Sequence, residues 1–216
     1  MRFFSRLGAA ALVLSLSANS VFADFITPAF RGDANTTYQA WDIFTTPTGA
    51  NAPDVAMSNV NGVASVTETT GTAFITSGGN IYSFAAATAF NVVVPDFNLG
   101  SGYITNAVVQ IRTQGTAIDT NSVLFNGVAA TSSTLLFEQA LGGFGGALQD
   151  WEFVFSNVAG NIASDVITFN ASGSSMSLDK LAIDTQAVAV PEAGTLIFTG
   201  MSVLGAGLYL RRRRSK

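Results

Sequence analysis

The sequence predicts an all-β protein whose main domain is an antiparallel, jelly-roll-like β-sandwich, with a signal peptide before the domain and one transmembrane helix after it. Short apolar runs alternate with turn residues along the middle of the chain. Glycine is frequent, with 21 residues, and charged residues make up only 11% of the total. This composition suits short strands joined by many turns and argues against a helical bundle. With 216 residues, 48% of them apolar, the chain is long enough for one domain with a substantial core.

Residues 1–23 are typical of a secretory signal peptide. Arg2 and Arg6 form the basic start, and a short apolar segment follows over residues 7–16. The end of the segment places Ala23 where a signal peptidase cuts, so we expect cleavage after it. A retained N-terminal anchor is the alternative, but the apolar segment has only about half of the ~20 residues that a membrane span needs.

The C-terminal end combines a short motif, a short apolar run and a basic cluster. The motif is Val190-Pro191-Glu192, and the run over residues 195–210 predicts a transmembrane helix. Its length gives roughly 24 Å against a hydrocarbon core of ~30 Å, a gap that snorkelling side chains and a thinner bilayer can close. Four consecutive arginines resist translocation, so we expect the domain outside and the tail inside. This stop-transfer cluster is Arg211, Arg212, Arg213 and Arg214.

This order of motif, span and arginines resembles the PEP-CTERM sorting signal. The family typically has Val-Pro-Glu-Pro before the span; here Val190, Pro191 and Glu192 match, and Ala193 replaces the second proline. The resemblance covers residues 190–214. It implies an exosortase-type membrane protease as a partner, which cuts near the motif and passes the domain to the envelope or the extracellular matrix, in company with exopolysaccharide production. An ordinary single-pass anchor without cleavage is the alternative.

Between the two ends, residues 24–189 form one predicted extracytoplasmic domain of about nine or ten strands. Gly78-Gly79-Asn80 and Asn126-Gly127 each separate two strand-length runs and predict hairpins. Pro95 is expected to end a strand or to mark a sheet edge. The glycine-rich segment 142–146 is expected to connect the two sheets.

Two strands show clear alternation. Val109 and Ile111 alternate with Gln110 and Arg112, which predicts a strand with one buried and one exposed face. The run 150–155 places three aromatic residues at a period of two and predicts a strand that covers the core. These aromatic residues are Trp151, Phe153 and Phe155.

The last predicted strand changes phase. Met176 and Leu178 share one parity, whereas Leu181 and Ile183 share the other. A side-chain period of two cannot change phase without an extra residue. We therefore expect a β-bulge near Asp179-Lys180.

Two segments of the domain are similar to jelly-roll modules that are often found before PEP-CTERM tails. Residues 32–44 resemble the start of such modules, and residues 176–185 resemble their final strand. Together with the strand pattern, this favours a jelly roll.

Several kinds of chemistry are excluded by composition. The chain has neither cysteine nor histidine, so it forms no disulfide, no Ser-His-Asp triad, no Cys-His pair and no imidazole or thiolate zinc site. Between residues 24 and 190 lie three basic and thirteen acidic residues, a formal charge of −10. A domain of this charge does not bind nucleic acid through its phosphates, but it attracts divalent cations.

Three groups of residues are candidates for a site. Asp150 and Glu152 are spaced for glycosidic acid/base chemistry, although alternation predicts that both face solvent. Three loops place oxygen ligands two residues apart and are candidates for a structural calcium ion, with Asx turns as the alternative; they are Asp33-x-Asn35, Asp96-x-Asn98 and Asp119-x-Asn121. Four aromatic residues are candidates for a sugar-stacking platform, with Trp41 favoured as core; they are Tyr38, Trp41, Tyr82 and Tyr103.

The expected function follows from the signals at the two ends of the chain and from the kinds of chemistry that the composition excludes. We expect an exported cell-surface or extracellular-matrix protein of structural or adhesive role, not an enzyme, with no catalytic and no cofactor-binding residues assigned. The alternatives are a carbohydrate-binding module acting on exopolysaccharide and, third, a glycan-active hydrolase or lyase. The expected partners are the membrane, the exosortase-like protease and extracellular polysaccharide, and not nucleic acid.

Overall fold

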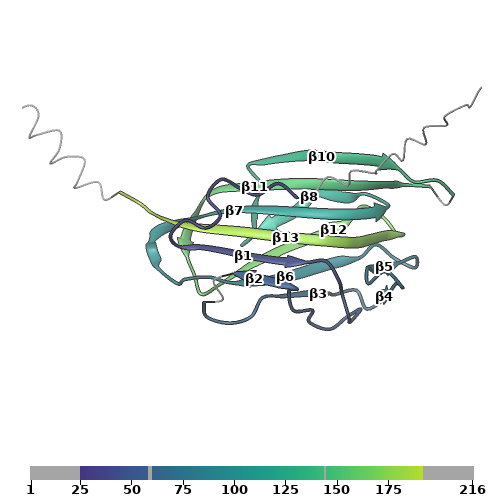
Figure 1. The fold of residues 1–216 in the computed structure, drawn as a ribbon, viewed down its shortest axis with the longest axis horizontal. Helices are drawn as coiled ribbons and strands as arrows, with labels where there is room; N and C mark the ends of the chain where they lie inside the picture. Colours follow the sequence, from purple (N-terminus) through teal and green to yellow (C-terminus); the bar gives the residue numbers. More distant parts are fainter. Residues whose placement is uncertain (1–24, 58–59, 144, 192–216) are drawn as a thin grey trace, which may run out of the picture.

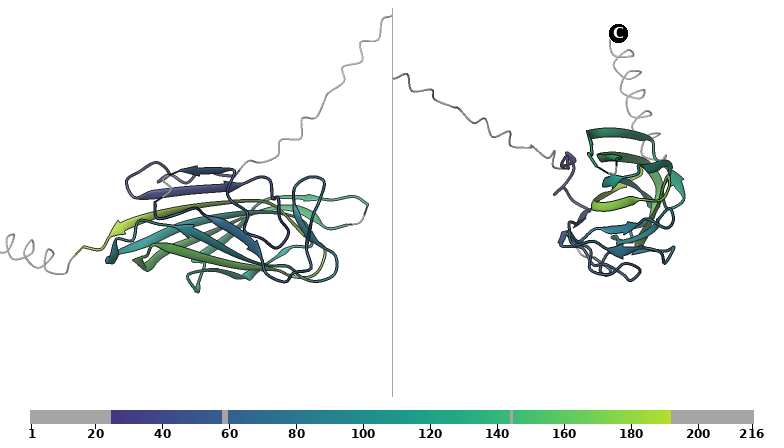
Figure 2. Two further views of the ribbon diagram at one scale, coloured as in Figure 1. Left: turned by 90° about the horizontal axis from the view of Figure 1, so that it is seen from below. Right: turned by 90° about the vertical axis from the view of Figure 1, so that its right-hand side faces the viewer.

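The computed structural model describes residues 25–57, 60–143 and 145–191, and in these residues the protein is all-β (Figure 1). Thirteen strands in this part of the chain form two antiparallel sheets that pack against each other, as the view along the strands shows (Figure 2). The predicted all-β, antiparallel class is therefore correct. Among the described residues, no helix has the length and apolar character needed to span a membrane, and the predicted signal peptide and transmembrane helix lie outside them.

The larger sheet has the strand order β10-β11-β7-β13-β1-β2. Strands β1 and β5 lie end to end along the same edge of β13. Strand β4 pairs with β5 and forms a hairpin with it. The predicted hairpin at Gly78-Gly79-Asn80 is therefore confirmed. The strands are β1 (Thr36–Trp41), β2 (Val55–Met57), β4 (Phe74–Ile75), β5 (Ile81–Ser83), β7 (Gly100–Gly115), β10 (Ser132–Ala140), β11 (Ala147–Asn161) and β13 (Met176–Ala189).

The smaller sheet has the strand order β3-β6-β12-β8-β9. Pro95 is the last residue of β6, as its missing N–H predicts. Asn126 and Gly127 have φ angles of 50° and 78° and join β8 to β9 in the predicted hairpin, because a tight turn of this kind needs two residues with positive φ. The strands are β3 (Ser65–Glu68), β6 (Ala89–Pro95), β8 (Ile118–Phe125), β9 (Val128–Ala129) and β12 (Ser164–Ala171).

Aromatic side chains from both sheets fill the core. Phe155 of β11 meets Phe125 of β8 with ring centroids 5.5 Å apart, which links the two layers. Phe90 and Phe169 stack within the smaller sheet at 4.8 Å. Phe153 and Phe155 are fully buried, and Trp151 packs against this core, so the predicted aromatic face of the strand is confirmed.

The predicted β-bulge in the last strand is also confirmed. Leu178 of β13 lies opposite Thr113 of β7, and Lys180 lies opposite Arg112, so Asp179 is the extra residue. This one insertion changes the phase of the strand. As a result, the apolar residues on both sides of it face the core and are buried: Met176, Leu178, Leu181 and Ile183.

The expected exposed face of β7 is buried instead. The segment over residues 25–35 crosses the outer face of the larger sheet, and its Ile26 exchanges two hydrogen bonds with Gln110. The Ile26 N–H donates to Gln110 Oε1 at 2.7 Å, and Gln110 Nε2 donates to the Ile26 carbonyl at 2.6 Å. Farther along the segment, Arg31 Nε and Nη2 donate to the buried carboxylate of Asp184 at 2.5 and 2.8 Å. Apolar and polar residues do alternate between the two faces of β7, but residues 25–35, which are distant in sequence, cover its polar face.

The prediction that Asp150 and Glu152 both face solvent is wrong for Asp150. The register of β7 and β11 places Arg112 opposite Asp150. Arg112 Nε and Nη2 donate to Asp150 Oδ1 and Oδ2 at 2.6 and 2.8 Å, and both side chains are buried. Glu152 is half-buried, and this burial raises the pKa of its carboxyl.

The glycine-rich segment 142–146 does not connect the two sheets as expected. It joins β10 to β11, which are neighbours in the larger sheet, and the Leu141 N–H donates to the Gly146 carbonyl at 2.9 Å across the turn. Strand β11, which carries the three aromatic residues, therefore pairs with β10, and both strands belong to the same sheet.

Two aspartates meet at the end of the smaller sheet, and both are fully buried. Asp165 Oδ1 accepts from Asn126 Nδ2 at 2.7 Å, and Asp96 Oδ1 accepts from the Phe97 N–H at 2.6 Å. The Oδ2 atoms of both aspartates have no hydrogen-bond partner among the described residues. Burial, followed by the neighbouring carboxyl of Asp96, raises the pKa of Asp165 to about 7, against the opposing hydrogen bond from Asn126.

Replacing Arg112 with methionine is expected to lower the free energy of unfolding by about 3–5 kcal/mol, because Asp150 then stays buried without its cation. Replacing the pair together, Arg112→Met with Asp150→Leu, is expected to recover most of this loss. Urea unfolding of the two variants and the wild type measures both effects. A single variant within about 1 kcal/mol of the wild type would contradict the buried ion pair.

Asp165→Asn is expected to remove a pH dependence of stability. The folded-state pKa of Asp165 lies above the unfolded value of about 3.9, so its contribution is complete below that value and is lost as the pH rises toward 7. The loss amounts to at most about 1.4 kcal/mol per pH unit. The variant should therefore gain stability relative to the wild type between about pH 4.5 and about pH 7.5, measured by urea unfolding. A difference between the two proteins that stays constant over this range would show that the pKa of Asp165 is not raised in the folded state.

Candidate functional site

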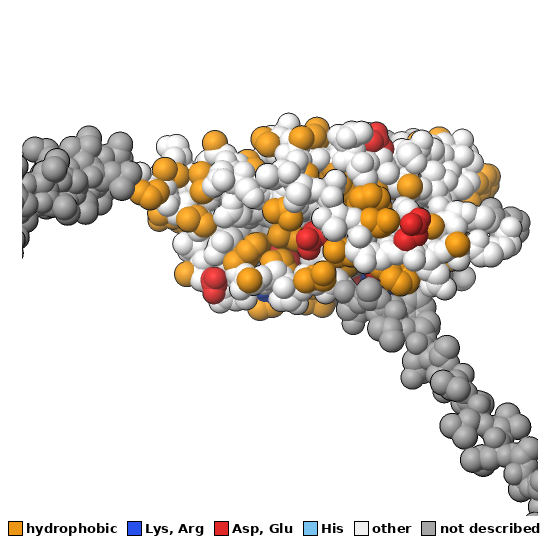
Figure 3. Space-filling view, turned by 90° about the horizontal axis from the view of Figure 1, so that it is seen from above, with side chains coloured by type: hydrophobic (Ala, Val, Ile, Leu, Met, Phe, Trp, Pro, Cys, Tyr) orange, Lys and Arg blue, Asp and Glu red, His pale blue; other side chains and the backbone are white. Residues whose placement is uncertain are grey.

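The surface of the domain is acidic because its few basic side chains are engaged in ion pairs. Arg31 and Arg112 bind buried carboxylates, and Lys180 Nζ lies 3.2 Å from Asp42 Oδ1. These are the three basic residues of the part of the chain that the structure describes. The face seen from above β10 displays acidic side chains among hydrophobic and neutral polar groups, with hardly any basic side chain in view (Figure 3). A ligand therefore meets neutral and acidic groups on this domain.

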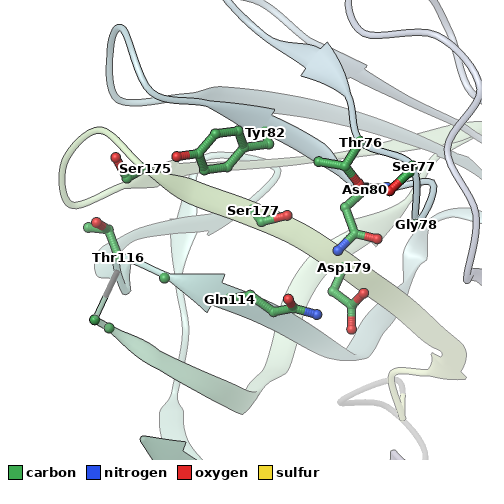
Figure 4. Close-up of a pocket in the computed structure, with 13 residues that line it drawn as sticks. Thr76, Ser77, Gly78, Asn80, Tyr82, Gln114, Thr116, Ser175, Ser177 and Asp179 are labelled. Carbon is green, nitrogen blue, oxygen red and sulfur yellow. Dashed lines mark hydrogen bonds between the residues drawn. The ribbon is translucent and has the colours of Figure 1, made fainter. Parts of the chain in front are cut away.

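An open cleft of about 800 Å³ lies on the outer face of the larger sheet, where β5, β13 and β7 run side by side (Figure 4). This volume is typical of small-ligand sites. Apart from four glycines, the residues that line the cleft carry polar side chains, and these are neutral except for Asp179. The lining consists of Thr76, Ser77, Gly78, Asn80, Tyr82, Gln114, Gly115, Thr116, Gly145, Gly146, Ser175, Ser177 and Asp179.

Strand register forms the floor of the cleft. Tyr82 of β5 lies opposite Ser177 of β13, and Ser177 lies opposite Gln114 of β7. Directly opposite residues in antiparallel strands project from the same face of the sheet. Because Met176 and Leu178 face the core, this row faces outward. The three residues are far apart in sequence and meet only through strand pairing.

The bulge supplies the one charged side chain among the described residues that line the cleft, Asp179. As the extra residue of β13, it departs from the alternation of its neighbours, and bulges commonly re-aim a side chain in this way. Figure 4 shows Asp179, Asn80 and Gln114 turned toward the same hollow from three different strands or turns.

The polar groups of the cleft lack partners in the protein. Asn80 and Ser177 are each only 7% exposed. Within residues 25–57, 60–143 and 145–191, no hydrogen bond is made by the side chains of Asn80, Ser177, Gln114 or Asp179, or by the hydroxyl of Tyr82. None of these atoms is among the fully buried polar atoms that lack a partner, so solvent in the open cleft reaches them. The cleft therefore presents donors and acceptors that are available to water or to a ligand.

Three aromatic rings form a cluster beside the cleft. Phe74, Tyr82 and Phe84 have ring centroids 5.4, 5.8 and 6.4 Å apart, and Tyr82 also lines the cleft. Phe74 is 41% exposed and Phe84 is 68% exposed. Large exposed aromatic groups that gather in one place mark interaction sites more often than isolated ones do.

Tight turns hold the walls of the cleft. In the β4–β5 hairpin, the Gly79 N–H donates to the Thr76 carbonyl and the Thr76 N–H donates to the Asn80 carbonyl, both at 3.0 Å, which fixes Asn80 at the rim. Gly79 has a φ of 82°. At the other wall, a Cβ at Gly115 would clash with the carbonyl oxygen of Ser175, so the close approach of these two backbones needs glycine.

The predicted aromatic platform does not assemble. Trp41 is fully buried in the core, as favoured, and Tyr38 lies under the Arg31 guanidinium at 3.5 Å. Tyr103 lies opposite Ala189 at the far end of β13 from Tyr82. Of the four predicted aromatic residues, the cleft contains only Tyr82. The sequence reasoning missed its neighbours in the site: Phe74, Asn80, Phe84, Gln114, Ser177 and Asp179.

The other candidate residues are used in local structure. Asp119 Oδ1 accepts from the Asn121 N–H at 3.1 Å in an Asx turn, which is the alternative reading of this loop. Asp96 is buried beside Asp165. Within the described residues, no group of three or more acidic side chains comes together as a metal site. Asp150 and Glu152 are not among the residues that line the cleft.

The predicted sorting motif begins directly after the last strand. β13 ends at Ala189, and the Val190 N–H donates to the Gly102 carbonyl at 2.9 Å. Val190 is 45% exposed. Glu192, like the predicted cleavage residue Ala23 and the arginine cluster, lies outside the described residues.

Comparison with protein-family models, with curated proteins and with solved structures gives no match for this chain.

Proposed function

We propose that the protein is an exported cell-surface or extracellular-matrix protein of structural or adhesive role and not an enzyme. Its signal peptide at residues 1–23 directs export, and a helix at residues 195–210 with the following arginines holds the C-terminus inside. An exosortase-type protease sorts it through the motif that begins at Val190. The domain at residues 24–189 is a jelly-roll-like sandwich.

The observation that supports this proposal is that the C-terminal end of β13 lies far from the cleft. The cleft lies where β13 begins, beside β4 and β5, and β13 ends near the opposite side of the domain (Figure 1). The 14 residues of β13, Met176–Ala189, span roughly 40 Å of strand. A domain that is tethered through its C-terminus therefore directs the cleft away from the membrane, as adhesion requires.

The place of the motif supports processing near it. Because β13 ends at Ala189, a cut after Val190 leaves the strands of both sheets intact. The exposure of Val190 gives a protease access to the chain at this point. The released or transferred product is then the whole folded domain.

A second candidate function is carbohydrate binding, which the cleft favours specifically. Neutral polar groups without partners, next to exposed aromatic rings, suit a sugar chain. A glycan-active hydrolase or lyase has less support. Glycoside hydrolysis normally uses two carboxyl groups that flank the scissile bond, and Asp179 is the one carboxylate among the described residues that line the cleft.

Mass spectrometry of the mature protein from the native host tests the sorting proposal. We expect the N-terminus at Asp24 and a C-terminus near the motif. Glu192→Gln is expected to block the C-terminal cut, and Glu138→Gln, on the exposed strand β10, serves as the matched control that is cut normally. A mature chain that still ends in Lys216 would remove the sorting claim and leave a plain membrane anchor.

A further inference from the structure

The unpaired groups of the cleft match the hydrogen-bonding character of sugar hydroxyls. Asn80 and Gln114 carry side-chain amides, which both donate and accept, and Ser177 and Tyr82 carry hydroxyls, which do the same. A sugar hydroxyl also donates and accepts, so it can satisfy either role. Asn80 and Ser177 are each only 7% exposed as whole residues, but their polar atoms are not fully buried and are open to a ligand in the cleft.

The aromatic cluster offers a stacking surface for the apolar faces of sugar rings. A sugar ring has apolar C–H faces, and aromatic faces carry partial negative charge that attracts such C–H groups. Phe74 and Phe84 expose their rings next to Tyr82, which belongs to both the cluster and the cleft. A chain of sugar units that rests on this cluster therefore continues into the polar hollow.

The charge of the cleft and of the domain determines whether a charged or an uncharged glycan can bind. Binding of uronate, sulfate or phosphate groups on a polysaccharide typically needs an arginine or a lysine. The three basic side chains of the described domain are already paired with Asp184, Asp150 and Asp42. None of the three lines the cleft, and the one charged group among its described lining residues is the carboxylate of Asp179. An acidic polysaccharide is therefore repelled both locally and by the charge of −10 on the domain.

We propose that this cleft binds an uncharged polysaccharide chain, with Phe74, Tyr82 and Phe84 as the stacking surface and Asn80, Gln114, Ser177 and Asp179 as hydrogen-bonding groups for its hydroxyls. The proposal rests on the second candidate function, carbohydrate binding, and names its ligand class and site. The C-terminal end of the domain then faces the envelope, while the opposite end of β13, which begins at Met176, holds the polymer.

The test uses the full-length chain, purified in detergent, and the extracellular polysaccharide of the native host. Anion exchange separates this polysaccharide into a neutral and an acidic fraction, and affinity electrophoresis in gels that contain each fraction measures binding. We expect retardation by the neutral fraction alone. The apparent Kd should stay the same from about 0.05 M to about 0.5 M NaCl, because no ion pair contributes to the binding.

Phe84→Ala and Gln114→Ala are expected to weaken this binding about tenfold or more, the effect of losing one important contact. Val63→Ala removes an equally exposed apolar side chain outside the cleft and is the matched control, which should bind like the wild type. Thermal melting checks that each variant is folded. If one cleft variant unfolds, the other still provides the test.

Three results would overturn the proposal: no retardation by the neutral fraction, retardation by the acidic fraction alone, or cleft variants that bind as the wild type does. Failure here is distinct from failure of the sorting proposal, which the mass of the mature chain decides. A protein that is processed at its tail but ignores the neutral fraction would keep its surface role and lose this ligand.

Discussion

The one extra residue in β13 is the constraint on which the rest of the structure depends. Side chains along a strand alternate between its two faces, so a regular β13 would bury either Met176 and Leu178 or Leu181 and Ile183, but not both pairs. The bulge at Asp179 buries all four and gives the larger sheet a continuous apolar inner face. The same insertion re-aims a carboxylate into the cleft on the outer face, so one residue connects the core to the candidate site.

The outer face of the larger sheet is divided into a covered part and an open part. Over β7 and β13, the segment 25–35 seals polar side chains with backbone hydrogen bonds and with the pair of Arg31 and Asp184. Beyond the bulge this cover ends, and the groups of the cleft face outward without partners in the described residues. Polar groups that are closed in by the protein contribute to its structure, whereas those left open are available for binding. This division is the physical basis for placing the site at the β5 end of the sheet.

Local patterns predicted the local features. The phase change in β13, the aromatic strand and the turn at Asn126-Gly127 each depend on residues that are close in sequence, and all three were predicted correctly. The burial of Asp150 was not, because it depends on Arg112 in another strand. The cleft was missed for the same reason, since Tyr82, Gln114 and Ser177 meet only through the registers of three strands. A strand of three residues such as β2 is too short to show a period, so nine or ten strands were expected where thirteen are described.

The central role of the bulge is tested most directly by comparing two variants, one in which Asp179 is deleted and one in which only its side chain is removed. Asp179→Ala keeps the extra backbone unit, so the variant should unfold in urea close to the wild type. Deletion of Asp179 forces β13 back into phase and turns two of its core side chains outward, so it should cost several kcal/mol, on the order of 4 or more for two buried aliphatic groups. A deletion variant that unfolds at the same urea concentration as Asp179→Ala would contradict the account.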